Sequence, residues 1–325
     1  MKIKSRKILA ALPLVLTAFI MAAFMAGAAS VKKAEDQGGP VPDFRHVFIK
    51  LFVEVSERLD HDEFFSLMEE MTDEEIAGIS FFLAEAGRRE LFTRLPLRRV
   101  EKILHRTPQG VILESGKKKL DRVAGYTTVV YKQERIDGGL QGEEKILLKY
   151  RSSPHSIYMK WLAGPYQGRE LLYNEKLLGP GKVRVRESGL LGVVAVTISV
   201  DSKLAKRGTN HKATEIGLHY LLEVIAKNHN KAAPKGEVQR KSHGIVLLDG
   251  VHVYKMESIL PQSPDAGYYC RRIIHYIDYK RSLLVKARIF DSEDRLAESY
   301  YYTDIEINPK FGAAAFDPHN PDYDL

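Results

Sequence analysis

The stretch KILLKYRSSPHSIYMKWL, residues 145–162, decides the fold of this chain. On either side of its central turn, apolar and polar side chains alternate with a period of two, which is typical of half-buried β-strands. Ile146, Leu148 and Tyr150 would point to one side of the first strand. A strand of the same kind starts at Ser156, and two strands joined this closely indicate an antiparallel pair.

The same pattern continues in both directions along the chain. Short apolar segments separated by Gly- and Pro-rich breaks predict about ten or eleven strands. These strands are expected at residues 127–132, 145–150, 156–161, 171–173, 183–185, 193–198, 245–248, 251–260, 268–279, 283–290 and 296–307. One helix interrupts them at residues 214–227, where Leu218, Leu221, Leu222 and Ile225 share a face.

Nearly all connections between these strands are short and local. We therefore predict an α+β fold, in which a strongly curved antiparallel sheet (a half-barrel) wraps on the inserted helix and follows a small all-helical segment. One helix covers only part of the sheet's inner face. The remaining apolar surface is therefore either core or the wall of a cavity.

Residues 1–28 have the order of an export signal, with positive charge, an apolar run and then small residues. The positive charges are Lys2, Lys4, Arg6 and Lys7. We predict cleavage near Ala28 and a periplasmic or otherwise exported protein, whereas an uncleaved run would anchor the protein in the inner membrane. Removing the signal lowers the formal net charge from +7 to +3, so net charge does not indicate a nucleic-acid partner. A flexible linker is expected over residues 29–43.

Residues 44–108 are predicted to form a small helical segment. Thr72 followed by Glu75 fits a capping box at the start of a helix that should end near Gly87. A further helix is expected from Leu91 to His105. The apolar faces of these helices must be buried against one another or against a partner protein.

Two blocks in the β-rich half carry a resemblance to a known family. They are PHSIYMKWL (residues 154–162) and GRELLY (residues 168–173), and the segment around EIGL (215–218) and the ending FDPHNPDY (316–323) agree further. On these residues the chain, over about 115–325, resembles the uncharacterised bacterial family DUF1571. That family is similar in architecture to LolA-like periplasmic lipoprotein carriers, which are half-open β-barrels with a helical lid and an apolar cavity for acyl chains. The resemblance implies the same curved sheet here and leaves the activity open.

The common signatures of catalysis and metal binding are missing from the sequence. The 11 histidines include no HExxH or His–Cys cluster, and no P-loop, GxSxG or GxGxxG motif occurs. The single cysteine, Cys270, cannot form an internal disulfide. Asp317, Asn320 and Asp322 lack the Gly and Glu of an EF-hand. We predict no enzyme activity, no metal and no cofactor, and a hydrolase built from distant carboxylates stays open as an alternative.

Two functions fit this organisation. The first is a non-enzymatic periplasmic binding protein or carrier that shelters a lipid or lipoprotein acyl chain in an apolar cavity. The predicted cavity lining consists of Val129, Ile146, Leu148, Ile157, Met159, Trp161, Leu171, Tyr173, Leu218 and Leu222. The predicted contacts with an anionic headgroup are Lys203, Lys206, Arg207 and Lys212. The alternative is an envelope scaffold or protein-interaction module, in which the core is filled and residues 44–108 dock a partner.

Overall fold

The computed structural model describes residues 49, 52–54, 56, 59–189, 194–261 and 267–325. The chain forms two compact units, residues 1–107 and 108–325. The predicted signal (1–28) and linker (29–43) lie outside the described residues. Within the residues that are described, no helix combines the length and the apolar character needed to cross a membrane.

Four short helices make up most of the described part of the first unit. They are α3 (His61–Glu70), α4 (Asp73–Ile79), α5 (Glu85–Arg94) and α6 (Leu97–Arg106). The predicted capping box is present, because Thr72 N donates to Glu75 Oε2 at 2.8 Å and Glu75 N donates to Thr72 Oγ1 at 3.3 Å. The predicted helix end near Gly87 is wrong, since this glycine lies inside α5. The helix predicted over 91–105 is divided between α5 and α6 at Pro96, which cannot donate a backbone hydrogen bond.

The second unit begins with a helix that the sequence pattern did not predict, α7 (Gln109–Leu120). It packs against α9 (Gly217–Ala232), which the sequence predicted at 214–227. Two glycines make this close approach possible. A Cβ atom on Gly116 would lie 3.2 Å from the Leu222 side chain, and one on Gly110 would lie 3.1 Å from His229. The low helix propensity of glycine also hides α7 in the sequence.

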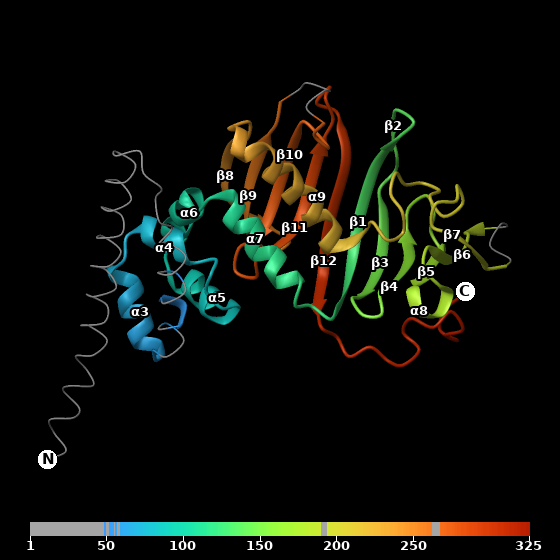
Figure 1. The fold of residues 1–325 in the computed structure, drawn as a ribbon, viewed down its shortest axis with the longest axis horizontal. Coiled ribbons are helices and arrows are strands. Elements are labelled where there is room, and N and C mark those ends of the chain that lie inside the picture. Colours follow the sequence, from blue (N-terminus) through green and yellow to red (C-terminus); the bar gives the residue numbers. More distant parts are fainter. Residues whose placement is uncertain (1–48, 50–51, 55, 57–58, 190–193, 262–266) are drawn as a thin grey trace, which may run out of the picture. The chain divides into compact units, whose positions relative to one another are not determined.

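Twelve antiparallel strands form one open sheet in the second unit (Figure 1). The strands are β1 (Gly125–Ile136), β2 (Gly139–Leu140), β3 (Glu144–Arg151), β4 (Ser156–Ala163), β5 (Glu170–Asn174), β6 (Lys182–Arg186), β7 (Val196–Ser199), β8 (Gln239–Leu248), β9 (Val251–Ile259), β10 (Arg272–Asp278), β11 (Leu283–Phe290) and β12 (Leu296–Ile307). Their order is β7-β6-β5-β4-β3-β1-β12-β11-β10-β9-β8, and β2 lies off this path, paired with β1. The predicted fold class is confirmed, and the strand beyond the predicted ten or eleven is the two-residue β2. The short helices α8 (Glu175–Leu178) and η2 (Ala233–Lys235) lie in connections.

Helix α9 lies across one face of the sheet, which we call the inner face (Figure 1). Its predicted apolar positions, Leu218, Leu221, Leu222 and Ile225, are all buried. The helix start is fixed to β1, because Leu218 N donates to Tyr126 Oη at 3.0 Å. Gly217 makes this contact possible: its φ is +91°, and a Cβ atom there would lie 2.2 Å from Tyr126 Oη.

The substitution Gly217→Ala should lower the free energy of unfolding by at least about 2 kcal/mol. The left-handed backbone alone costs a residue with a Cβ about 1–2 kcal/mol, and the clash with Tyr126 adds to it. Urea unfolding followed by far-UV circular dichroism measures the loss. Gly236→Ala is the matched control, because Gly236 has φ +68° but nothing lies within 4 Å of its Cβ position. Equal losses in both variants would show that the Tyr126 contact contributes nothing.

The opposite, outer face of β4 and β5 is covered by the end of the chain, which Figure 1 shows near α8. Phe316 packs with Tyr158 and Leu172, and Asn174 Nδ2 donates to Phe316 O at 2.7 Å. The buried Glu170 accepts hydrogen bonds from Tyr158 Oη at 3.0 Å and from the backbone N of residue 324 at 3.2 Å. The proline-rich ending therefore acts as a cover of the outer face, and it contributes to the core of this unit.

Candidate functional site

The inner face of β3, β4 and β5 is mostly apolar and mostly buried. Of the ten residues predicted to line a cavity, seven lie there and are at most 5% exposed. These are Ile146, Leu148, Ile157, Met159, Trp161, Leu171 and Tyr173. Cross-strand register explains the shared face, because Ile146 lies opposite Trp161, and Met159 lies opposite both Leu148 and Leu171.

Three of the ten predicted residues lie elsewhere. Val129 points to the outer face, since Val130 is the residue of β1 that lies opposite Ile146 and is completely buried. Because Val129 and Val130 are both apolar, the sequence does not show which of them faces the core, and an error of one residue assigns every side chain of the strand to the wrong face. Leu218 and Leu222 are buried on α9, but neither borders the small cavity beneath this helix, which Gly217, Tyr220, Leu221 and Val224 line from the helix side.

A loop over residues 200–216, which we call the cover loop, closes the apolar part of the inner face. Beneath it lies a cavity of about 30 Å³. The apolar part of its floor is formed by Ile146, Met159, Trp161 and Leu171, and the apolar part of its roof by Ala205, Ala213 and Ile216 of the cover loop. Polar side chains complete the lining, namely Lys132, Glu134, Arg169, Thr209, His211, Lys212, Glu215 and Tyr300. A second cavity, beneath α9, measures about 10 Å³. Volumes of this size hold about one water molecule, so neither of these two cavities has room for an acyl chain in the conformation described.

Arg169 fastens the first half of the cover loop. This side chain is 1% exposed, and its guanidinium donates to three backbone carbonyls: Arg207 O at 2.8 Å, Leu204 O at 2.8 Å and Ala205 O at 3.1 Å. Its Nε lies 3.2 Å from Glu187 Oε1, a carboxylate that also pairs with the Arg207 side chain. Arg169 also lies over the Trp161 ring at 4.9 Å, which joins the fastening to the apolar floor.

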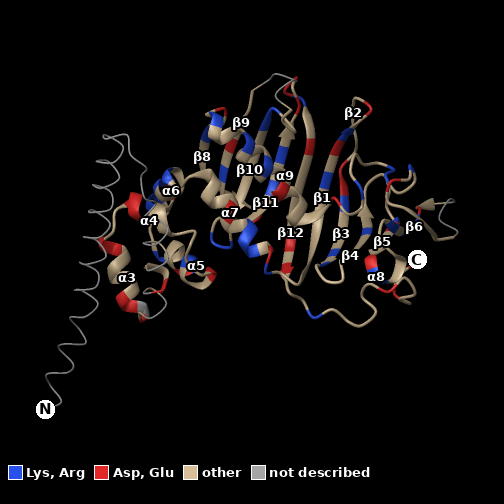
Figure 2. Cartoon of the chain, viewed as in Figure 1, with Lys and Arg blue, Asp and Glu red and all other residues tan. Residues whose placement is uncertain are grey.

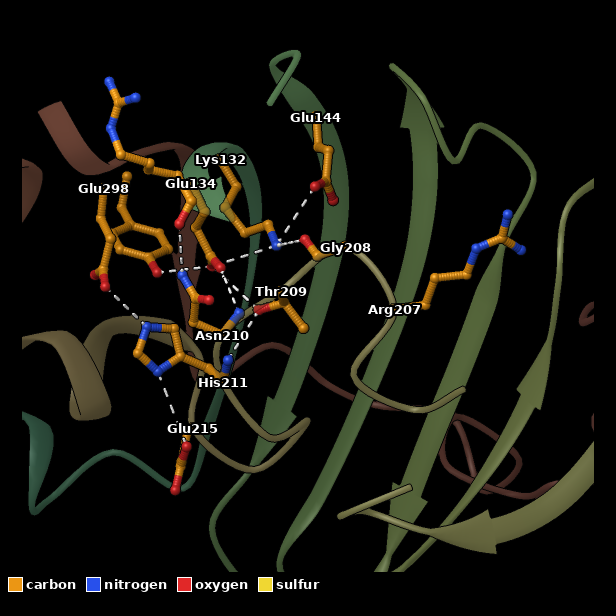
Figure 3. A network of polar contacts seen from close by, with 12 residues as sticks. Lys132, Glu134, Glu144, Arg207, Gly208, Thr209, Asn210, His211, Glu215 and Glu298 are labelled. Atoms are coloured by element: carbon orange, nitrogen blue, oxygen red, sulfur yellow. Dashed lines mark hydrogen bonds and ion pairs between the residues drawn. The ribbon is translucent and has the colours of Figure 1, made fainter. Parts of the chain in front are cut away.

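Lys132 and Glu134 fasten the middle of the cover loop (Figure 3). Lys132 Nζ is 3.3 Å from Glu134 Oε1 and 3.4 Å from Glu144 Oε1, and it donates to Gly208 O at 3.2 Å. Glu134 Oε2 accepts from Asn210 N at 2.8 Å. Burial disfavours the charged form of Glu134, but Lys132 and the Asn210 N–H outweigh it and hold the pKa of this carboxyl below its ordinary value. For Glu144 burial prevails and raises the pKa.

His211 fastens the last part of the cover loop to β12 (Figure 3). Its Nε2 lies 3.2 Å from Glu298 Oε1, and Tyr220 Oη lies 3.2 Å from its Nδ1. Burial opposes protonation of this imidazole. The hydrogen bond to Glu298 and the charges of Glu298, Glu134 and Glu215 outweigh that effect and raise the pKa of His211.

The predicted headgroup contacts all lie on the cover loop, but they do not act as four free cations. Arg207 Nη1 pairs with Glu187 at 3.2 Å, and Lys212 Nζ pairs with Asp201 at 3.0 Å. Lys203 and Lys206 form no ion pair with any residue that the structure describes. The cover loop therefore offers two unneutralised lysines to an anion.

Nothing in the described part of the chain is arranged for metal binding, since no group of three or more His, Cys, Asp or Glu side chains is suitably placed. Cys270 is buried, and this burial, together with the charge of Glu298, raises the pKa of the thiol to about 12, so the thiol stays protonated. The buried Arg169, Glu134, Glu144 and Glu187 were not predicted as site residues. The contacts of Arg169 and Glu134 with the cover loop span 35 to 76 positions of the sequence, so spacing gives no signal of them.

Comparison with known proteins places the second unit in a family. The family described as "Protein of unknown function (DUF1571)" matches residues 123–325. This covers more than half of the chain, which therefore belongs to the DUF1571 family. None of the curated proteins compared with the chain matches it.

Several solved structures share a general likeness with the chain. The lipoprotein LppX of Mycobacterium tuberculosis is 16% identical, with 63% of this chain and 99% of that chain covered and a TM-score of 0.38. The LolA superfamily protein NE2245 of Nitrosomonas europaea is 11% identical, with coverage of 63% and 96% and a TM-score of 0.27. The MucA/MucB complex of Pseudomonas aeruginosa gives 11% identity, coverage of 62% and 60%, and a TM-score of 0.34.

Proposed function

We propose that this protein is a non-enzymatic, exported carrier that shelters the acyl chain of a lipid or lipoprotein between the inner face of β3–β5 and the cover loop. One observation carries the proposal. The apolar floor of Ile146, Met159, Trp161 and Leu171 is closed by a segment with neither helix nor strand, residues 200–216. A core that is only structural is normally closed by a helix or a second sheet.

The cover loop is attached in a way that permits release. Its fastenings are hydrogen bonds and ion pairs to Arg169, Lys132 and Glu134, which are directional and short-ranged. The apolar side chains that the cover loop presents to the cavity are Ala205, Ala213 and Ile216, and two of these are small. An acyl chain that replaces them would gain about 0.8 kcal/mol for each buried CH₂ group. Loading then requires displacement of the cover loop from the position described.

Binding of cis-parinaric acid, a fluorescent fatty acid, tests this proposal. Protein purified from cells that express the full chain and then delipidated should bind about one equivalent, and mass spectrometry of the untreated protein should detect an extractable lipid. Leu171→Gln places a polar side chain in the floor and should weaken binding at least about tenfold. Leu162→Gln is the matched control, because Leu162 is 37% exposed. Absence of uptake by the folded, delipidated wild-type protein would reject the carrier.

A second candidate function is an envelope scaffold or protein-interaction module. The small cavities favour it, since about 30 and 10 Å³ leave no room for a lipid in the state described. In that case residues 44–108 would dock the partner. Cross-linking in intact cells should then capture a specific protein with the full chain and lose it when residues 44–108 are deleted, while fatty acid uptake is absent. Capture that survives the deletion would reject this module.

A further inference from the structure

Six side chains form a continuous row across the outer face of the sheet, at right angles to the strands. From β3 to β9 they are Lys145, Tyr131, Tyr301, Lys286, Tyr276 and Lys255, which we call the Lys–Tyr row. Each is directly opposite the next in register on the neighbouring strand. With about 4.8 Å between strands, the row is about 24 Å long.

Contacts between neighbours give the row a regular structure. Lys145 Nζ lies 5.5 Å from the Tyr131 ring, which stacks on Tyr301 at 6.0 Å. Lys286 Nζ lies between two rings, 4.9 Å from Tyr301 and 5.6 Å from Tyr276. Because the ring faces are occupied by these neighbours, the row exposes ammonium groups and phenol edges to solvent.

The lysines of the row have no direct ion-pair partner among the described residues. Lys145, Lys255 and Lys286 form no ion pair or hydrogen bond with any described residue. Asp249 lies beside the row and accepts a hydrogen bond from Tyr301 Oη at 2.6 Å. Burial and the neighbouring charge of Arg288 lower the pKa of Lys286, and they outweigh the charges of Asp249 and Glu143, which raise it; an approaching anion would therefore stabilise the charged form of Lys286. Figure 2 shows basic residues on several neighbouring strands of the sheet.

We propose that the Lys–Tyr row binds a linear anionic polysaccharide in which acidic sugars are separated by neutral ones. The lysines are two or three strands apart, or about 10–14 Å. Anionic groups at that spacing would pair with the ammonium groups, and the hydroxyl groups of intervening neutral sugars would accept hydrogen bonds from Tyr131 and Tyr276. This inference does not depend on the acyl-chain proposal, which concerns the opposite face.

Two features of the row disfavour other polyanions and membranes. A nucleic acid carries a charge on every unit and gains affinity from bases stacked on open aromatic faces, whereas the ring faces of the row are already covered. A flat membrane would touch only part of a row that crosses six strands of a strongly curved sheet. A flexible glycan can follow that curve along its length.

Binding of fluorescently labelled hyaluronate, in which acidic and neutral sugars alternate, tests the inference at low ionic strength. The triple variant Lys145→Gln/Lys255→Gln/Lys286→Gln should bind at least about tenfold more weakly than wild type. The matched control, Lys227→Gln/Lys235→Gln/Lys310→Gln, removes the same charge from exposed positions outside the row and should change the affinity less than about twofold. Tyr131→Phe/Tyr276→Phe keeps every charge and should still weaken binding, by about threefold to tenfold.

Thermal unfolding of each variant verifies the fold before its affinity is interpreted, and the tyrosine variant decides the outcome if the lysine variant does not fold. The inference is overturned if wild type fails to bind hyaluronate, or if the control variant loses as much affinity as the row variant. It is also overturned if poly(U) RNA or vesicles of phosphatidylglycerol bind more tightly than hyaluronate. Neutral dextran should not bind.

Discussion

Replacing Arg169 by methionine should lower the free energy of unfolding by about 3 kcal/mol and release the first half of the cover loop. The side chain is 1% exposed and holds three carbonyls as well as Glu187. Methionine has a similar length but no donor, so the carbonyls lose their partners. Breaking a buried ion pair from one side costs about 3–5 kcal/mol, and the low end applies because Glu187 keeps Arg207. Urea unfolding measures the loss.

Trypsin provides an independent readout of the released loop, because Lys203, Lys206 and Arg207 are potential cleavage sites within it. Cleavage there should be faster in Arg169→Met than in wild type. Arg295→Met is the matched control, since the Arg295–Asp291 pair is partly exposed and should contribute less than about 1 kcal/mol. If Arg169→Met unfolds like this control, or leaves cleavage within 203–207 unchanged, Arg169 does not fasten the cover loop.

Acidification should destabilise the protein through His275, and His275→Gln should remove that part of the pH dependence. Burial is the main cause that lowers the pKa of this imidazole to about 3, and the nearby His229 and Arg240 add to it. The unfolded chain binds the proton near pH 6.5 whereas the folded chain does not. The contribution of His275 to stability is therefore fully present above pH 6.5 and falls by about 1.4 kcal/mol per pH unit as the pH decreases toward 3.

Between pH 6.5 and 4.5 the wild type should consequently lose about 2–3 kcal/mol more than His275→Gln. Guanidinium unfolding at both pH values measures this difference, even if the substitution itself alters stability at neutral pH. His211 contributes with the opposite sign, because its raised pKa gives stability that is present below pH 6.5 and lost at higher pH, but both proteins share it. His319→Gln, at an exposed position, should behave like wild type. Equal losses in wild type and His275→Gln would contradict the assignment.

The sheet could be predicted from the sequence because its signals are local. Residues 283–290 and 296–307 alternate in polarity between clear turns, and β11 and β12 have these bounds. The sequence could not show which side chains of β1 lie on the inner face, since Val129 and Val130 are equally apolar. Helix α7 was missed because Gly110 and Gly116, which allow α9 to approach, also weaken its helix signal.

The candidate site could be predicted only in part, because sequence patterns report local periodicity and not contacts between distant residues. The inner face of β3–β5 follows from strand alternation, and seven of the ten predicted residues share that face. The contacts that fasten the cover loop could not be predicted in this way. Arg169 donates hydrogen bonds to the backbone of residues 204–207, and Glu134 accepts one from Asn210, which is 76 positions away. No periodic pattern connects residues so far apart, and only the folded sheet brings them together.

The central claim, that an acyl chain enters beneath the cover loop, is tested most directly by the fluorescence of Trp161. This is the single tryptophan of the chain, and it lies in the floor of the cavity. A brominated fatty acid should quench Trp161 emission to saturation at about one equivalent, and an unbrominated acid of equal length should restore the emission by competition. Unchanged Trp161 emission at saturating brominated fatty acid, in delipidated and folded protein, would contradict the claim.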